Sequence, residues 1–211
     1  PQCGRKGKTM ATTLIKPPYE LTVYDFFVHF DADDNGNEAL DLQLPVVKSI
    51  GVKPSEQKQT IHASGVIYDT VSTVTEPTLS LSSVALPREF TDRADGSVKK
   101  GCAAADVAQP IKPTFACGYW CGNSDGSKTY YYHPQCKLSY SDDETHQTRT
   151  NTPVDPSVGR TVDIMPTNEG IWRVRYYTNG VTKPLTPQEF FEKQPNTLEK
   201  VMALDGAESA K

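Results

Sequence analysis

Three cysteines and one histidine between residues 117 and 136 carry side chains that bind zinc in many proteins: Cys117, Cys121, His133 and Cys136. Thiolate and imidazole groups at short spacings are typical of tetrahedral zinc sites. If the segment is a strand, however, Cys117 and Cys121 share one face and lie roughly 13 Å apart. Chelation by both would require a bend. The pattern therefore favours buried thiols that act as small apolar side chains, with zinc as the alternative.

A second candidate ion site begins at Asp31. Asp31, Asp33, Asn35 and Gly36 match the first half of a calcium loop, which needs oxygen ligands at alternate positions and then a glycine. The last ligand of such a loop is a bidentate glutamate, and Leu42 stands at that position. Asp and Asn are also the residues that a tight turn prefers. The segment is therefore interpreted as a turn, with calcium binding as the alternative.

The remaining cysteines, Cys3 and Cys102, have no evident partner, and the total of five is odd. A complete intramolecular disulfide framework is therefore excluded. The basic N-terminal residues lead into no apolar stretch, which is unlike a secretory signal. We expect reduced thiols and synthesis in a reducing compartment.

Signatures of catalysis or cofactor binding are missing from the sequence. It contains no Gly-x-Ser-x-Gly elbow, phosphate loop, dinucleotide fingerprint or His-Glu-x-x-His motif. No apolar run approaches the ~18–20 residues of a membrane-spanning helix. The sequence thus predicts a non-enzyme without cofactor and without a membrane span.

Charge is unevenly distributed along the 211 residues. Residues 1–16 carry four basic side chains and no acidic one, whereas the chain as a whole has 22 basic and 26 acidic residues. The remainder is therefore left with 18 basic and 26 acidic residues, a net charge of −8. A net negative charge disfavours binding to nucleic acid, because affinity for phosphate comes mainly from Lys and Arg. The basic arm is either a solvated terminus or a segment that docks on an acidic neighbouring surface.

Hydrophobic residues recur mostly with period two, which indicates half-buried strands. One face of the first candidate strand carries Tyr24, Phe26, Val28 and Phe30. Further strands are predicted over 40–44, 46–52 (stopped by Pro54), 60–70, 78–84, 115–121, 129–133 and 138–140, and over 158–164 paired with 171–178. Residues 122–127 predict a hairpin turn.

Two short helices are expected, over 86–93 and over 186–193, where a capping box begins at Thr186. Residues 97–113 and 142–157 are interpreted as loops. The prediction is one mainly β, antiparallel β-sandwich or barrel-like domain over 19–195, with one or two short helices. Residues 1–18 and 196–211 are assigned to an N-terminal arm and a C-terminal arm or tail.

Six segments in a characteristic order carry a family resemblance. The chain resembles the major tail tube proteins of long-tailed, non-contractile bacteriophages in the segments 63–70 (ASGVIYDT), 79–82 (LSLS), 86–90 (LPREF), 112–119 (KPTFACGY), 131–134 (YYHP) and 161–164 (TVDI). The most specific piece is the LPREF helix start that follows the LSLS strand. The likeness covers roughly residues 20–180.

The resemblance implies a structural virion protein. Members of that family fold as a β-sandwich with a flanking helix, and six copies form a ring whose strands complete an inner barrel. Stacked rings form a hollow tail tube, assembled in the host cytoplasm, that encloses the tape-measure protein and conducts DNA without sequence-specific binding. The implied partners are further copies of the chain, the tape-measure protein, and the tail terminator and baseplate or distal tail proteins.

The resemblance also makes 31–45 the ring-stacking loop and the termini the bridging arms. The assembly residues expected on this basis are Asp31, Asp33, Asp34, Asn35, Leu40, Leu42, Arg5, Lys6 and Lys8. The alternative function is a monomeric β-sandwich that binds carbohydrate or protein, or decorates a larger particle. Such a module would need a pocket lined by aromatic and polar groups.

Overall fold

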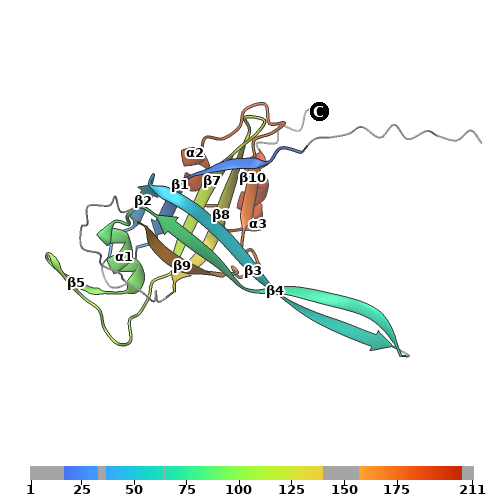
Figure 1. Cartoon of the computed structure of the whole chain (residues 1–211), viewed down its shortest axis with the longest axis horizontal. Coiled ribbons are helices and arrows are strands. Elements are labelled where there is room, and N and C mark those ends of the chain that lie inside the picture. The colour runs from blue at the N-terminus through green and yellow to red at the C-terminus, as the bar shows by residue number, and fades with distance from the viewer. Residues whose placement is uncertain (1–16, 33–36, 64, 140–156, 206–211) are drawn as a thin grey trace, which may run out of the picture.

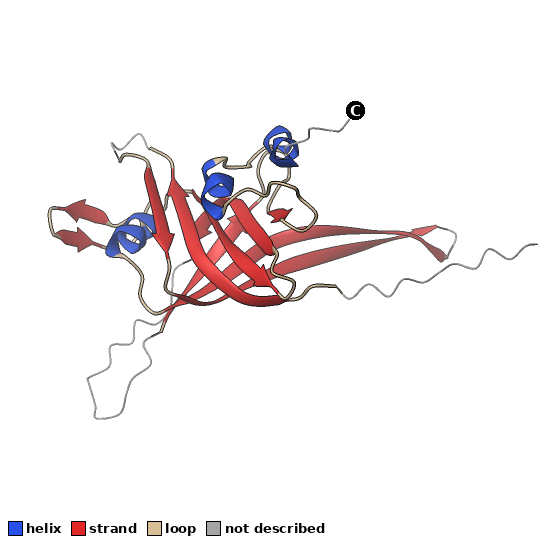
Figure 2. Cartoon of the chain, turned by 90° about the horizontal axis from the view of Figure 1, so that it is seen from above, coloured by secondary structure: helices blue, strands red, loops and turns tan. Residues whose placement is uncertain are grey.

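The computed structural model describes residues 17–32, 37–63, 65–139 and 157–205, and it consists mainly of antiparallel strands (Figures 1 and 2). Eight strands form one sheet in the order β2-β1-β7-β8-β9-β4-β3, and β10 also pairs with β8. The bounds of these strands are β1 (Glu20–Phe30), β2 (Leu40–Leu44), β3 (Val47–Ala63), β4 (Val66–Ser83), β7 (Phe115–Asn123), β8 (Lys128–Leu138), β9 (Val158–Met165) and β10 (Val174–Tyr177). The predicted mainly β, antiparallel, barrel-like fold is confirmed.

One apolar core fills the inner face of the sheet. It draws buried side chains from β1, β2, β4, β7, β8 and β9, and α1 (Arg88–Asp95) adds Phe90 and Ala94. Phe30, Phe90 and Phe115 pack at its centre, with ring centroids 5.1–6.3 Å apart. Aromatic packing of this kind adds to the hydrophobic free energy of burying the rings. The inner core therefore fixes α1 against the sheet.

A second apolar cluster lies on the outer face of β7, β8 and β10. Tyr130 and Tyr132 of β8 point outward there, against Phe190 of α2 (Pro187–Glu192) and Leu204. Because strand side chains alternate between faces, Tyr131 between them packs on the inner core instead. Strand β8 therefore supplies side chains to the inner core from one face and to the outer apolar cluster from the other.

The first strand differs from the predicted alternation at its start. Asp25 adopts φ 28° within a register shift between Tyr24 and Phe26, which is a β-bulge. A bulge adds one residue to one strand, so the faces exchange across it. Tyr24 therefore lies on the opposite face from Phe26 and is 43% exposed, whereas Val23 packs on the inner core. The prediction that Tyr24 shares a face with Phe26 is wrong for this reason.

Strand β8 is longer than predicted and has three partners. A bulge near Pro134 lets it continue to Leu138, as one strand where two were expected. Beside β7, its first half pairs with β10 and its second half with β9. The prediction that 158–164 pairs with 171–178 is wrong, because both segments align on β8, one after the other.

The turn and the two helices expected from local signals are present. Asn123 and Ser127 close the β7–β8 turn through a 2.9 Å backbone hydrogen bond. In α2, Thr186 and Glu189 form the reciprocal capping box that the sequence predicts. Helix α1 begins one residue after Pro87 and ends at Gly96. Between α1 and β7, the expected loop contains a small hairpin of β5 (Val98–Lys100) and β6 (Ala103–Ala105).

Part of the predicted C-terminal arm belongs to the body. Residues 198–205 form α3 (Leu198–Met202) and the 3-10 turn η1 (Ala203–Asp205). Thr197 caps α3, and Val201 and Leu204 pack on the outer apolar cluster. The arm assignment is therefore wrong for these residues, because two apolar side chains one turn apart give the segment a face to bury. No helix in the described ranges is long and apolar enough to cross a membrane.

Candidate assembly surface

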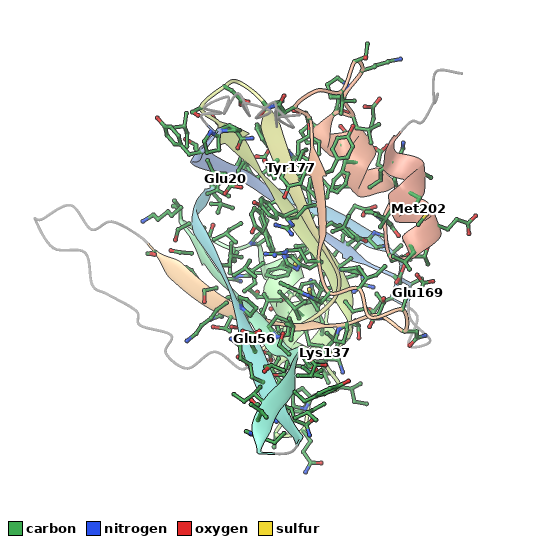
Figure 3. The ribbon with its side chains drawn as sticks, turned by 90° about the vertical axis from the view of Figure 1, so that its right-hand side faces the viewer. Glu20, Glu56, Lys137, Glu169, Tyr177 and Met202 are labelled. Carbon is green, nitrogen blue, oxygen red and sulfur yellow. The ribbon has the colours of Figure 1, made fainter. Side chains whose placement is uncertain are left out.

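A two-stranded ribbon projects from the sheet and is the largest departure from the sequence prediction (Figures 1 and 2). Strands β3 and β4 pair along their whole length, from Val47 opposite Ser83 to Ala63 opposite Val66. Strand β9 pairs with β4 only over Thr78–Ser83. Beyond that point β3 and β4 continue, and no third strand of the described residues pairs with them. Figure 3 views the ribbon from its free end, with Glu56 marking its position.

Two prolines mark where the ribbon leaves the sheet. The register shifts between Lys53 and Ser55 on β3, and the facing residues of β4 skip from Thr78 to Thr75. Pro54 and Pro77 lie inside this irregularity, where a missing N–H breaks no regular ladder hydrogen bond. Pro54 therefore does not stop the strand as predicted. It lies at the root of the ribbon instead.

The predicted strand over 60–70 is wrong, because the tip of the ribbon lies within it. Gly65 has φ 77°, a left-handed conformation that glycine adopts without strain. A Ser-Gly dipeptide is a known turn signal. The alternating residues before Gly65 belong to β3 and those after it to β4. Because the alternation continues through the turn, its period does not indicate where one strand ends and the next begins.

The ribbon is exposed on both faces. Every described side chain from Lys53 to His62 and from Val66 to Val74 is exposed. Six of these are large and apolar: Ile61, Val66, Ile67, Tyr68, Val71 and Val74, at 42–79% exposure. Within the described ranges, no strand pairs with the outer edge of either arm of the ribbon beyond Thr78. The ribbon therefore presents two unpaired edges and a concentration of apolar side chains.

The predicted stacking loop is much shorter in the structure. Residues 40–44 form β2, which pairs with β1 from Phe26–Leu44 to Phe30–Leu40. Leu40 and Leu42 pack against the inner core, and Leu44 is buried within it. Residues 40–44 are therefore a strand of the sheet, and the assignment of Leu40 and Leu42 to a stacking loop is wrong. The period-two alternation already predicted a strand here.

The ends of that connection are held by one side chain. Arg93 of α1 donates from Nη1 to the Glu38 carbonyl at 2.6 Å and from Nη2 to the Asp31 carbonyl at 2.9 Å. Its guanidinium also lies over the Phe30 ring, 4.9 Å from the centroid. Arg93 thus ties both ends of the connection to the helix. Asp33, Asp34 and Asn35 lie outside the described residues, as do Arg5, Lys6 and Lys8.

The carboxylate of Asp31 is engaged by a histidine. His29 contacts Asp41 Oδ1 through Nδ1 at 2.6 Å and Asp31 Oδ1 through Nε2 at 3.1 Å. Burial of the ring disfavours the charged form, but both carboxylates favour it, and the pKa of His29 is raised above its usual value. Protonated His29 can donate to both carboxylates at once. Asp31 therefore acts in a side-chain cluster across the β1–β2 hairpin.

The zinc-like spacing does not converge into a metal centre. Cys117 and Cys136 are buried with sulfur atoms 3.5 Å apart, and Cys121 lies further along the same inner face. His133 instead hydrogen-bonds the Trp172 carbonyl through Nδ1 at 3.1 Å, and burial lowers its pKa to about 4. In the described part of the chain, no three His, Cys, Asp or Glu side chains are grouped to hold an ion.

Burial also sets the chemistry of the thiols. It raises the pKa of Cys121 to about 12 and the pKa of Cys136 well above its ordinary value. Protonated, enclosed thiols are poor nucleophiles and poor metal ligands. Cys102, by contrast, is exposed near the β5–β6 hairpin. The interpretation of Cys117, Cys121 and Cys136 as small apolar side chains agrees with these positions.

A cleft of about 420 Å³ opens on the outer face, where α2 meets β1 and β2. Its apolar wall is Phe27 of β1 stacked on Phe191 of α2, with centroids 4.2 Å apart. Tyr132 and Gly118 also line it, and its polar groups are His29, Asp41, Gln43, Gln188, Glu192 and Gln194. No sequence pattern predicts this cleft, because its lining residues come from five separate segments of the chain.

Comparison with known families adds no assignment. No protein-family model matches the chain, and no curated protein sequence is significantly similar to it.

Proposed function

We propose that the chain is a self-assembling structural subunit that forms stacked rings, the hollow tail tube of a bacteriophage. The observation that carries this proposal is the β3–β4 ribbon. An isolated two-stranded hairpin is marginally stable in water, and unpaired edges invite pairing with another chain. Neighbouring copies would supply the missing strands and cover the apolar side chains.

The position of the ribbon fits that role. It extends the same sheet that surrounds the inner core, so a strand added to its edge would continue the sheet from one copy to the next (Figure 1). In a closed ring every such edge finds a partner, which prevents open-ended pairing. The ribbon replaces residues 31–45 as the proposed contact between copies. The resemblance of the segments quoted above to tail tube proteins supports the same conclusion.

The charge of the body agrees with a conduit for DNA. The chain beyond residue 16 has a net charge of −8. A lumen that bound phosphate through many Lys and Arg side chains would hold passing DNA, whereas a neutral or acidic lumen would not. No catalytic role is proposed, and the buried histidine and thiols fit a structural protein. The proposed location is the virion tail, after assembly in the host cytoplasm with the tape-measure and other tail proteins.

A monomeric binding module is the second candidate, and one observation favours it. Tyr24 stacks on Trp120 with centroids 4.1 Å apart, and Lys128 lies over the Trp120 ring. Trp120 itself is covered by these two side chains, but the Tyr24 ring is 43% exposed and can stack on a sugar ring. It does not account for the ribbon, so the assembly role is preferred.

Sedimentation velocity of two matched deletions tests the proposal. In the first variant, residues 55–75 are replaced by Asn-Gly, which favours a tight hairpin turn. In the control, residues 100–103 of the β5–β6 hairpin are replaced in the same way. We expect the intact chain and the control to form large particles, and the ribbon variant to sediment as a folded monomer with a strand-rich circular dichroism spectrum. Equal assembly by both variants contradicts the proposal, and a monomeric intact chain with glycan affinity supports the second candidate.

A further inference from the structure

The cleft between α2 and the β1–β2 hairpin is acidic as well as apolar. Among the residues that the structure describes, its lining includes two carboxylates, Asp41 and Glu192, and neither Lys nor Arg. The Asp41 side chain is 82% exposed and uses one oxygen for His29. Glu192 is exposed and accepts a hydrogen bond from Gln188 at 3.1 Å. Both carboxylates therefore keep capacity to accept hydrogen bonds from a further donor.

The walls of the cleft suit a long cationic side chain. The stacked rings of Phe27 and Phe191 form one wall, and the amides of Gln43 and Gln194 add further polar groups. Lys and Arg place their aliphatic stems on apolar surface and direct the charged head toward carboxylates or amides. The positive charge is also attracted to aromatic faces. An aromatic wall with acids at its rim is thus complementary to a basic peptide.

The same chain contains such a peptide. Residues 1–16 include Arg5, Lys6, Lys8 and Lys16 without any acidic residue, while the rest of the chain is acidic. We propose that the cleft binds the basic N-terminal segment of a second copy of this chain. This inference rests on the proposed self-assembly, because a second copy must lie nearby.

The place where the chain enters the fold favours a second copy over the chain's own segment. Strand β1 begins at Glu20, and His29 beside the cleft lies nine residues further along it. At about 3.3 Å per residue, the entry point is roughly 30 Å from the cleft. Tyr19 still hydrogen-bonds Ser124 beyond the start of β1, so to reach its own cleft the segment would have to reverse direction before Tyr19 and run back along β1. A neighbouring copy can present the segment to the cleft without that reversal.

Zero-length cross-linking tests the inference on the intact chain. Equal amounts of ¹⁴N- and ¹⁵N-labelled protein are mixed, assembled and treated with a water-soluble carbodiimide, which joins lysine amines to carboxylates in direct contact. We expect links from Lys6 or Lys8 to Asp41 or Glu192, with heavy and light chains joined. Links confined to chains of one label would show that the segment occupies its own cleft and overturn the inference. Links only to other carboxylates would also overturn it.

A matched pair of variants gives a second readout. Asp41→Asn with Glu192→Gln removes the cleft charges, and Glu89→Gln with Glu199→Gln removes two exposed charges from other helices. We expect the first pair to weaken self-association about tenfold at low salt, and less at high salt, with little effect from the control. Equal effects of the two pairs would overturn the inference. Particles that form without these cross-links contradict this inference alone, whereas a chain that never associates contradicts the proposed function itself.

Discussion

The ring of Phe191 on α2 stacks on the ring of Phe27 on β1, with centroids 4.2 Å apart and planes inclined by 24°. This contact fixes α2 over the outer face of the sheet, and it is possible because Gly118 lies beneath it. A Cβ at Gly118 would stand 2.2 Å from Phe191 Cε1 and 2.6 Å from the Tyr131 carbonyl oxygen. The absence of a side chain at Gly118 therefore allows α2 to pack closely on the sheet and determines the shape of the cleft.

Gly118→Ala should displace α2 and lower the free energy of unfolding by about 1–3 kcal/mol, because a methyl group has no room there. Urea unfolding measures the effect. Gly159→Ala in β9 is the control, since a Cβ there meets nothing within 4 Å. Phe191→Leu combined with Gly118→Ala should recover part of the loss, and a harmless Gly118→Ala would show that Phe191 does not lie over this glycine.

The contribution of His29 to stability should depend on pH. Its pKa in the folded protein is raised above about 6.5, so folding favours the protonated ring. The stabilisation is therefore complete below about pH 6.5 and is lost as pH rises through the folded-state pKa. The difference in unfolding free energy between the natural chain and His29→Asn should be larger near about pH 6 than near about pH 9. A difference that grows with pH would contradict the contacts with Asp31 and Asp41.

Of the four cysteines that the structure describes, only Cys102 should react rapidly in the folded protein. Cys117, Cys121 and Cys136 are buried, and thiolate formation at buried thiols is disfavoured. Iodoacetamide labelling followed by peptide mass spectrometry separates these sites. In denaturant all four should be labelled alike. Rapid native labelling of Cys117 or Cys136, or their protection by added zinc, would contradict the described core.

Arg93→Met should loosen the connection between β1 and β2. The variant keeps an apolar stem over Phe30 but loses the hydrogen bonds to the Asp31 and Glu38 carbonyls. We expect a loss of about 1–3 kcal/mol in the free energy of unfolding, and faster amide exchange over residues 37–41. Arg93→Lys should recover little of it, because a single ammonium cannot reproduce the paired geometry. Full recovery by lysine would contradict the bridging role.

Features set by neighbouring residues were predictable from the sequence. The capping box from Thr186 to Glu189 and the turn between Gly122 and Ser127 depend on residues only a few positions apart, and both are present. The alternating leucines at 40, 42 and 44 also predicted a strand, and the family-based loop assignment over that strand is wrong. Local chemistry was the better guide in this segment.

Features that depend on distant pairing were not predictable. The alternation of apolar residues is continuous around Gly65, so its period does not separate one strand from two. A proline terminates a strand only where the sheet needs a backbone N–H at that position, and at Pro54 it does not. The pairing of β9 and β10 with β8 is likewise decided by the sheet. The cleft depends on α2 reaching β1 over Gly118, and no spacing in the sequence encodes that contact.

Electron cryomicroscopy of the purified intact chain shows whether the β3–β4 ribbon joins neighbouring copies. We expect hollow stacked rings in which the ribbon of each copy, residues 55–75, is buried against its neighbours and joined to them edge to edge. A particle whose ribbon points into solvent, or a chain that remains monomeric at every concentration examined, would contradict this expectation.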